Sequence, residues 1–219
     1  MRRLALLAAL LSAPAWAGAP EDAPDPFAEA LDAARAGLFG QAAAGFHALA
    51  ETGDGEAAHN LAVLYATGRG LPQDDPEAAY WAIRAELAGS DRSIPLRRLL
   101  VSRLDDAARD ALAARAIAWL SPRAEAGDGA AMLEIAAILL TIPAQPDPVA
   151  AHGWQAIAAT LDAPGAVRAR QSSLALIPPE ARIEAAQTAR QHMRAWCAAR
   201  GPEAPAPCAL IPEDRQPQT

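Results

Sequence analysis

Side chains that could carry chemistry are few in this sequence and do not cluster. The four histidines, His47, His59, His152 and His192, stand apart and form no metal-binding motif such as His-Glu-x-x-His or Cys-x-x-Cys. No serine lies in a nucleophile-elbow context, and no glycine-rich phosphate-binding loop follows a strand. Because catalysis needs converging acids, bases, nucleophiles or metal ligands, we predict a protein without enzymatic activity, metal or cofactor.

Residues 1–17 have the pattern of a secretory signal peptide. Arg2 and Arg3 precede an apolar run over residues 4–11, and the small residues Ala15 and Ala17 mark a cleavage site. The apolar run is too short to cross a membrane. We therefore predict cleavage after Ala17 and a periplasmic or secreted mature chain that does not insert into a membrane.

Cys197 and Cys208 are the only cysteines, and export would deliver both to an oxidising compartment. Gly201 and the prolines that follow it turn the chain out of its last predicted helix, so that Cys208 can fold back. We predict a disulfide, which would contribute roughly 3 kcal/mol in the chain-entropy model. The alternative is a pair of free thiols, with Cys197 filling the core.

The charge of the chain is concentrated at one end. The net charge is −7, and it becomes −9 once the signal peptide, which holds two arginines and no acid, is removed. Residues 18–86 hold 12 acids and 3 arginines, whereas residues 87–219 hold 14 of each. An acidic first half would attract a basic partner, although it also suits a merely solvated surface. Nucleic-acid binding is disfavoured, because phosphate contacts need a basic footprint.

Alanine-rich apolar stretches and regular punctuation predict helices. Asp25, Asp75 and Asp147 each precede a proline, a pair that suits a helix start because aspartate caps free N–H groups and proline lacks one. Apolar residues recur at helical spacing between these starts and the glycines that follow. The ten predicted helices cover residues 26–36, 41–52, 55–67, 75–88, 93–103, 106–126, 129–141, 148–161, 165–175 and 179–199.

Tryptophans recur at the interval of a helical hairpin. Trp81, Trp119, Trp154 and Trp196 are separated by 38, 35 and 42 residues, the spacing expected if each hairpin contributes one tryptophan. None of these amphipathic helices can bury its apolar stripe alone, but stacked hairpins can. The pattern predicts an all-α array of stacked hairpins.

One segment, residues 53–89, carries a specific motif. Its characteristic positions are Gly53, Asp54, Ala57, Leu61, Tyr65, Gly68, Arg69, Gly70, Asp74, Ala78, Trp81, Ala85 and Gly89. The motif resembles the Sel-one-like repeat, a relative of the tetratricopeptide repeat. The resemblance implies a right-handed α/α solenoid of about five hairpins. It also implies an interaction role, because proteins with such repeats usually serve as scaffolds or regulators of enzymes.

A weaker copy of the motif spans residues 127–162. It keeps Gly127-Asp128 at its start and Trp154 in its second helix, but residues 142–144 replace the Gly-Arg-Gly turn and leave the hairpin angle open. The pairs at 93–126 and 165–199 are repeat-like by position only. Around the repeat domain, residues 26–199, we place a linker at 18–25 and a proline-rich tail at 200–219.

Polar residues on the first helix of a hairpin are the binding candidates, because solenoids present that helix on their concave surface. His59 and Asn60 lie off the apolar stripe of the helix predicted at 55–67, and Glu134 is the counterpart of Asn60 in the weaker copy. An asparagine amide can both donate to and accept from a peptide backbone. These residues predict a protein or peptide partner. Alternatively, Asn60 makes an inter-helix hydrogen bond and His59 is plain surface.

A second hypothesis is an envelope module that binds a cell-wall fragment or another small ligand. Saccharide grooves usually offer stacked aromatic side chains and paired carboxylates. The tryptophans at core spacing count against this hypothesis, and burial of all four indoles would remove its main support.

Overall fold

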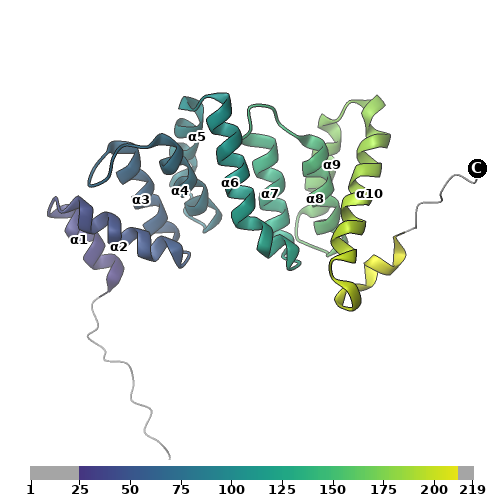
Figure 1. Cartoon of the computed structure of the whole chain (residues 1–219), viewed down its shortest axis with the longest axis horizontal. Helices are drawn as coiled ribbons and strands as arrows, with labels where there is room; N and C mark the ends of the chain where they lie inside the picture. Colours follow the sequence, from purple (N-terminus) through teal and green to yellow (C-terminus); the bar gives the residue numbers. More distant parts are fainter. Residues whose placement is uncertain (1–24, 212–219) are drawn as a thin grey trace, which may run out of the picture.

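The structure is a computed structural model that describes residues 25–211, so the predicted signal peptide lies outside the described residues. This part of the chain contains ten α-helices, three short 3-10 helices and no strand. The α-helices stand side by side in chain order, with α1 at one end of an elongated row and α10 at the other (Figure 1). Their bounds are α1 Pro26–Arg35, α2 Phe39–Glu51, α3 Gly55–Thr67, α4 Asp75–Leu87, α5 Ser93–Arg103, α6 Asp106–Glu125, α7 Gly129–Thr141, α8 Pro148–Thr160, α9 Ala166–Leu176 and α10 Arg182–Ala198.

Aspartate side chains fix where most of these helices begin. At the start of α1, α3, α4, α6, α7 and α8, a capping aspartate accepts a hydrogen bond from a backbone N–H of the first turn. In α4 the sequence offers Asp74 or Asp75 as the cap, and the structure shows Asp74 in this role, with Asp75 already helical. The last helix also differs from its predicted start, because Pro179–Ala181 form a separate 3-10 turn before α10.

The Gly-Arg-Gly turn of the best repeat joins α3 to α4 and also contacts α2. Gly68 ends α3 in the left-handed conformation, with a φ of 64°. Gly70 has a φ of 75°, and a Cβ there would overlap the backbone of Phe39 and approach the amide nitrogen of Gly40 to 2.5 Å. Two features therefore require glycine at position 70: the left-handed φ and the close approach of the start of α2.

Two of the hairpins are less tightly closed than the others. By sequence, α5 forms a hairpin with α6, and α9 forms a hairpin with α10. However, α5 has its main contacts with α4, and α9 has its main contacts with α8. The helix α10 likewise packs mainly on α8. These are the two hairpins that carry no clear repeat motif, and their looser closure leaves space beside α5 and between α9 and α10.

The four tryptophans differ in how deeply they are buried. Trp81 and Trp196 are core residues, with 2% and 7% of their surface exposed. Trp119 and Trp154 are half-buried and pack against the same core. The indole of Trp119 also faces the guanidinium of Arg84 at 4.8 Å, and that of Trp154 meets the ring of His192 edge-on at 4.5 Å. All four indoles thus take part in packing, but Trp119 and Trp154 are only half-buried, so the burial of all four that would remove the saccharide hypothesis is not met.

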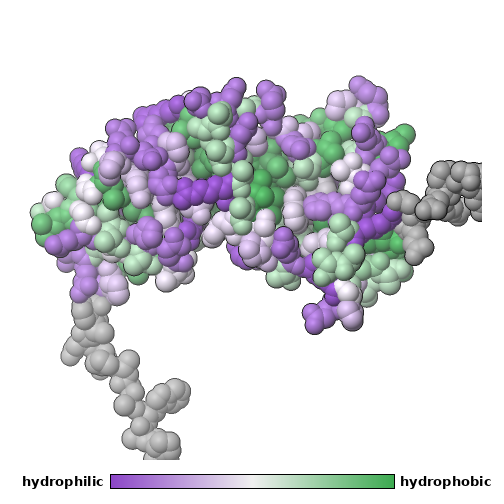
Figure 2. Space-filling view, viewed as in Figure 1, coloured by the Kyte–Doolittle hydropathy of each residue, from purple (hydrophilic) through white to green (hydrophobic). Residues whose placement is uncertain are grey.

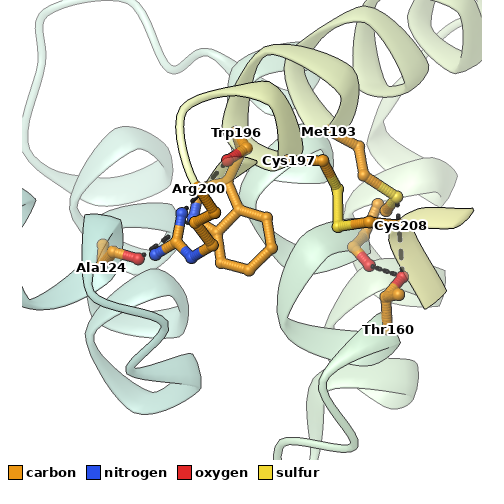
Figure 3. Close-up of a disulfide and its surroundings, with 8 residues drawn as sticks. Ala124, Thr160, Met193, Trp196, Cys197, Arg200 and Cys208 are labelled. Carbon is orange, nitrogen blue, oxygen red and sulfur yellow. Dashed lines mark hydrogen bonds between the residues drawn. A yellow bond between two sulfur atoms is a disulfide. The ribbon is translucent and has the colours of Figure 1, made fainter. Parts of the chain in front are cut away.

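The C-terminal end is fastened to the last hairpin (Figure 3). Cys197 in α10 and Cys208 form the predicted disulfide, with their Cα atoms 5.7 Å apart. Beside it, the indole N–H of Trp196 donates to the carbonyl oxygen of Ala124 at 3.2 Å, and Arg200 lies over the same indole at 3.6 Å. These contacts join α10 to the end of α6.

The outer surface is chemically mixed. On the face shown in Figure 2, hydrophobic residues gather over the α6–α7 region, between hydrophilic side chains over α3–α5 and over α10. Within residues 25–211, no helix is both long enough and apolar enough to span a membrane.

Candidate partner-binding grooves

An open groove lies between α1 and α3 at the N-terminal end of the array. Its volume is about 560 Å³, and Phe27 and Leu31 of α1 and Asn60 of α3 contribute to its walls. The sequence predicts Asn60 as a binding residue, and the structure places it, partly exposed, in this groove. Phe27 and Leu31 are missing from that prediction, although their spacing of four residues on a helix indicates a shared face.

Asn60 differs from its polar neighbours in having no partner of its own. Its side chain makes no hydrogen bond within the described part of the chain, so the alternative of an inter-helix bond is not what the structure shows. Asp25 and Asp54, which also line the groove, each use Oδ1 to cap a helix. Neither Oδ2 atom has a hydrogen bond among residues 25–211. The groove therefore presents a free amide and two free carboxylate oxygens.

One wall of the groove is held rigidly by a hydrogen-bonded cluster. Glu56 accepts from the hydroxyl of Ser90 at 2.6 Å and from the guanidinium of Arg92 at 2.7 Å. The Ser90 hydrogen bond, opposed by burial and reinforced by Arg92, holds the pKa of Glu56 below its usual range. Glu56 thus stays ionised and fixes the start of α5 against α3.

His59 is not on the surface, which corrects the expectation from the sequence. It is 8% exposed, and its Nδ1 lies 2.8 Å from the Oγ of Ser93 in α5. His59 lies off the apolar stripe of Ala57 and Leu61, but α5, the first helix of the following hairpin, covers this side of α3. The sequence does not reveal this because α5 carries no clear repeat motif. His59 joins two helices and is unable to contact a partner in this arrangement.

Glu134 lies in a separate cleft further along the array. This cleft has a volume of about 220 Å³ and runs between α5 and α7, with Ile83 and Leu87 of α4 at its base. Arg97 and Glu86 pair across one wall, with Arg97 Nε 2.5 Å from the carboxylate. Burial raises the pKa of Glu134, while Arg123, 3.4 Å away, acts in the opposite direction.

A second hollow adjoins the Glu134 cleft and has the opposite charge. It has a volume of about 340 Å³ and shares the lining residues Arg97 and Thr141 with the cleft. Its lining includes Arg98 and Arg109 and no carboxylate. Asn60 and Glu134 are equivalent by sequence, but the structure brings them to two different grooves.

One spacing recurs among the contacts between hairpins. Many of the hydrogen bonds between hairpins join residues 33–38 positions apart, which is the interval of the repeat. Examples are His59 with Ser93, Arg84 with Glu51, Arg109 with Ile142, Asp110 with Ala144, and Arg115 with Glu77. Each hairpin thus contacts the next through equivalent positions. The fold of the described residues is a solenoid of stacked helical hairpins.

Comparisons with known proteins give a distant structural likeness. No protein-family model matches the chain, and no curated protein matches it. The chain is similar to the crystal structure of a protective antigen present in uropathogenic Escherichia coli strains, described as displaying an SLR fold. The identity is 19% and the TM-score 0.36, and the match covers 89% of this chain and 34% of the antigen. The chain thus spans about a third of the antigen's length, and the fold assignment rests on the contacts above.

Titratable side chains in the solenoid do not converge. Within residues 25–211, no group of three or more histidine, cysteine, aspartate or glutamate side chains is placed to hold a metal ion. Of the four histidines, His59 and His152 are buried and His192 is half-buried. Burial is the first cause that lowers the pKa of His59, His152 and His192.

These buried histidines predict a loss of stability on mild acidification. Because their pKa values are lower in the folded chain than the reference of 6.5, the unfolded chain binds more protons as the pH falls below 6.5. The contribution of these histidines to the free energy of unfolding is therefore complete above pH 6.5. It is lost as the pH falls through their pKa values in the folded chain. Urea unfolding at pH 7.5, 6.5 and 5.5 should show a falling free energy of unfolding, and His192→Gln should flatten the decline. A constant or rising free energy over this range would contradict the prediction.

Proposed function

We propose that this protein is a non-catalytic binding scaffold that holds a segment of another protein in the groove between α1 and α3. The observation that carries the proposal is the combination of apolar walls with the free Asn60 amide and the free Oδ2 atoms of Asp25 and Asp54. An extended peptide offers backbone N–H and C=O groups, which an asparagine amide can satisfy together. Phe27 and Leu31 would receive an apolar side chain.

Charge favours a basic segment as the partner. Residues 25–88, which build the first two hairpins, contain ten acids and three arginines. Such an excess attracts arginine and lysine side chains and speeds their association. The two free carboxylate oxygens of the groove are suitable acceptors for a guanidinium or an ammonium group.

The Glu134 cleft supports a longer binding path along the same series of first helices. Asn60 and Glu134 lie on α3 and α7, which correspond in the two copies of the motif, and each faces a groove. A partner that occupies the α1–α3 groove and continues past α5 would reach Glu134. We place this interaction outside the cytoplasm, in the periplasm or in the medium, because the signal-peptide pattern and the disulfide both suit an oxidising compartment.

Selection from a random peptide library displayed on phage tests the proposal directly. Peptides selected on the purified chain should be enriched in arginine or lysine next to an apolar residue. Asn60→Ala should weaken the selected peptides about five- to tenfold, the effect of losing hydrogen bonds in a bound complex. The measurement is fluorescence anisotropy with a labelled peptide.

The matched control is Gln187→Ala, which removes an exposed amide from α10 at the other end of the solenoid. It should bind the peptides as the unchanged protein does. Enrichment of acidic peptides, or an equal loss of affinity in both variants, would refute the assignment to the α1–α3 groove.

A further inference from the structure

A second kind of site is built at the opposite end of the solenoid. Because α9 and α10 both pack on α8 and have their main contacts there, a cavity of about 380 Å³ remains between them. Its floor includes Leu174 of α9 and Met193 of α10, and its rim includes Arg170 of α9 and Arg190 of α10. The volume is within the range of small-molecule pockets, which combine apolar walls with a few polar groups.

The charge around this cavity is opposite to that of the whole chain. The helices α8, α9 and α10 contain five arginines and one acid, Glu184, in a chain whose net charge is −7. Glu184 is two residues from the lining residue Ala186, so the two side chains lie on different faces of α10. No carboxylate lines the cavity. Among residues 25–211, the side chains that line it therefore carry a net positive charge.

The two arginines of the rim are free to bind. Neither the guanidinium of Arg170 nor that of Arg190 makes an ion pair or a side-chain hydrogen bond within the described part of the chain. They come from the two different helices that flank the cavity. A planar guanidinium binds a carboxylate or a phosphate through two parallel hydrogen bonds.

We propose that the cavity between α9 and α10 binds a small organic anion, with its carboxylate or phosphate group between Arg170 and Arg190 and its apolar part on Leu174 and Met193. The acidic groove at Asn60 and this basic cavity would then recognise ligands of opposite charge at the two ends of one solenoid. The proposal does not depend on the peptide-binding function, because the two sites share no residue.

Three probes that differ only in their head group test this site on the full chain. Hexanoate, hexyl phosphate and hexylammonium are titrated separately, and amide chemical shifts are followed by NMR. We expect saturable shifts in α9 and α10 with the two anions and none with hexylammonium. The tighter of the two anions identifies whether a carboxylate or a phosphate is preferred.

Arg190→Gln and Arg170→Gln should each weaken the preferred anion about tenfold, because each removes charge-assisted hydrogen bonds. The control is Arg168→Gln, which removes the same charge from an exposed position on α9 and should change affinity less than about twofold in physiological salt. Circular dichroism establishes that each variant is folded. Binding of hexylammonium as tight as that of the anions, the absence of saturable shifts, or an equal loss in Arg168→Gln would overturn the proposal.

Discussion

Replacing Arg84 by alanine should lower the free energy of unfolding by about 2–4 kcal/mol. Arg84 is 5% exposed, and its guanidinium lies between the indoles of Trp81, at 4.5 Å, and Trp119, at 4.8 Å. It also donates to the carbonyl oxygen of Ala50 and to the carboxylate of Glu51, each at 3.1 Å. One side chain therefore links α2, α4 and α6, and its truncation leaves a cavity and removes these contacts.

Urea unfolding followed by tryptophan fluorescence measures this effect. Arg84→Lys should fall between the alanine variant and the unchanged protein, because lysine keeps the charge but loses the planar stacking and the forked hydrogen bonds. The control is Arg35→Ala, which breaks an exposed ion pair with Asp32 and should cost less than about 0.5 kcal/mol. A cost for Arg84→Ala as small as that of Arg35→Ala would show that the stacked arginine does not hold the hairpins together.

Gly70→Ala should destabilise the chain by about 3 kcal/mol or more, because a left-handed φ and a backbone overlap combine at this residue. The added Cβ would collide with Phe39 and Gly40 at the start of α2 and force the α3–α4 turn away from the first hairpin. The loss should concentrate in α1 and α2, where amide hydrogen exchange will be fastest.

A second glycine separates the two causes. Gly37 has a φ of 77°, close to that of Gly70, but nothing lies within 4 Å of its Cβ position. Gly37→Ala should therefore carry the conformational cost alone, about 1–2 kcal/mol. Equal destabilisation in the two variants would mean that the contact between the repeat turn and α2 is unimportant.

The helices were predictable from the sequence because their signals are local. Asp-Pro pairs, capping aspartates and glycines act within a few residues, so most of the predicted bounds agree with the structure to within two residues. The main exception is α10, which starts three residues late because Pro179–Ala181 form their own turn.

The grooves were less predictable because they depend on how the hairpins pack. Asn60 is in a groove as expected, but the burial of His59 depends on α5, which lies 34 residues ahead and has no clear motif. The role of Arg84 also needs the contact between successive hairpins. By contrast, the basic region of α8–α10 is visible in the charges of the individual helices. It is hidden when charges are summed over residues 87–219.

The hydrogen bond from Trp196 to Ala124 joins residues 72 positions apart, about twice the interval of the repeat. This hydrogen bond links α10 back to α6, so that the helices from α6 to α10 form a closed ring of contacts. By contrast, α1 and α2 are attached to the rest of the solenoid chiefly through α3. A chain built in this way should not melt in one step. We expect the acidic end to open first and the α6–α10 ring to persist as the last cooperative unit.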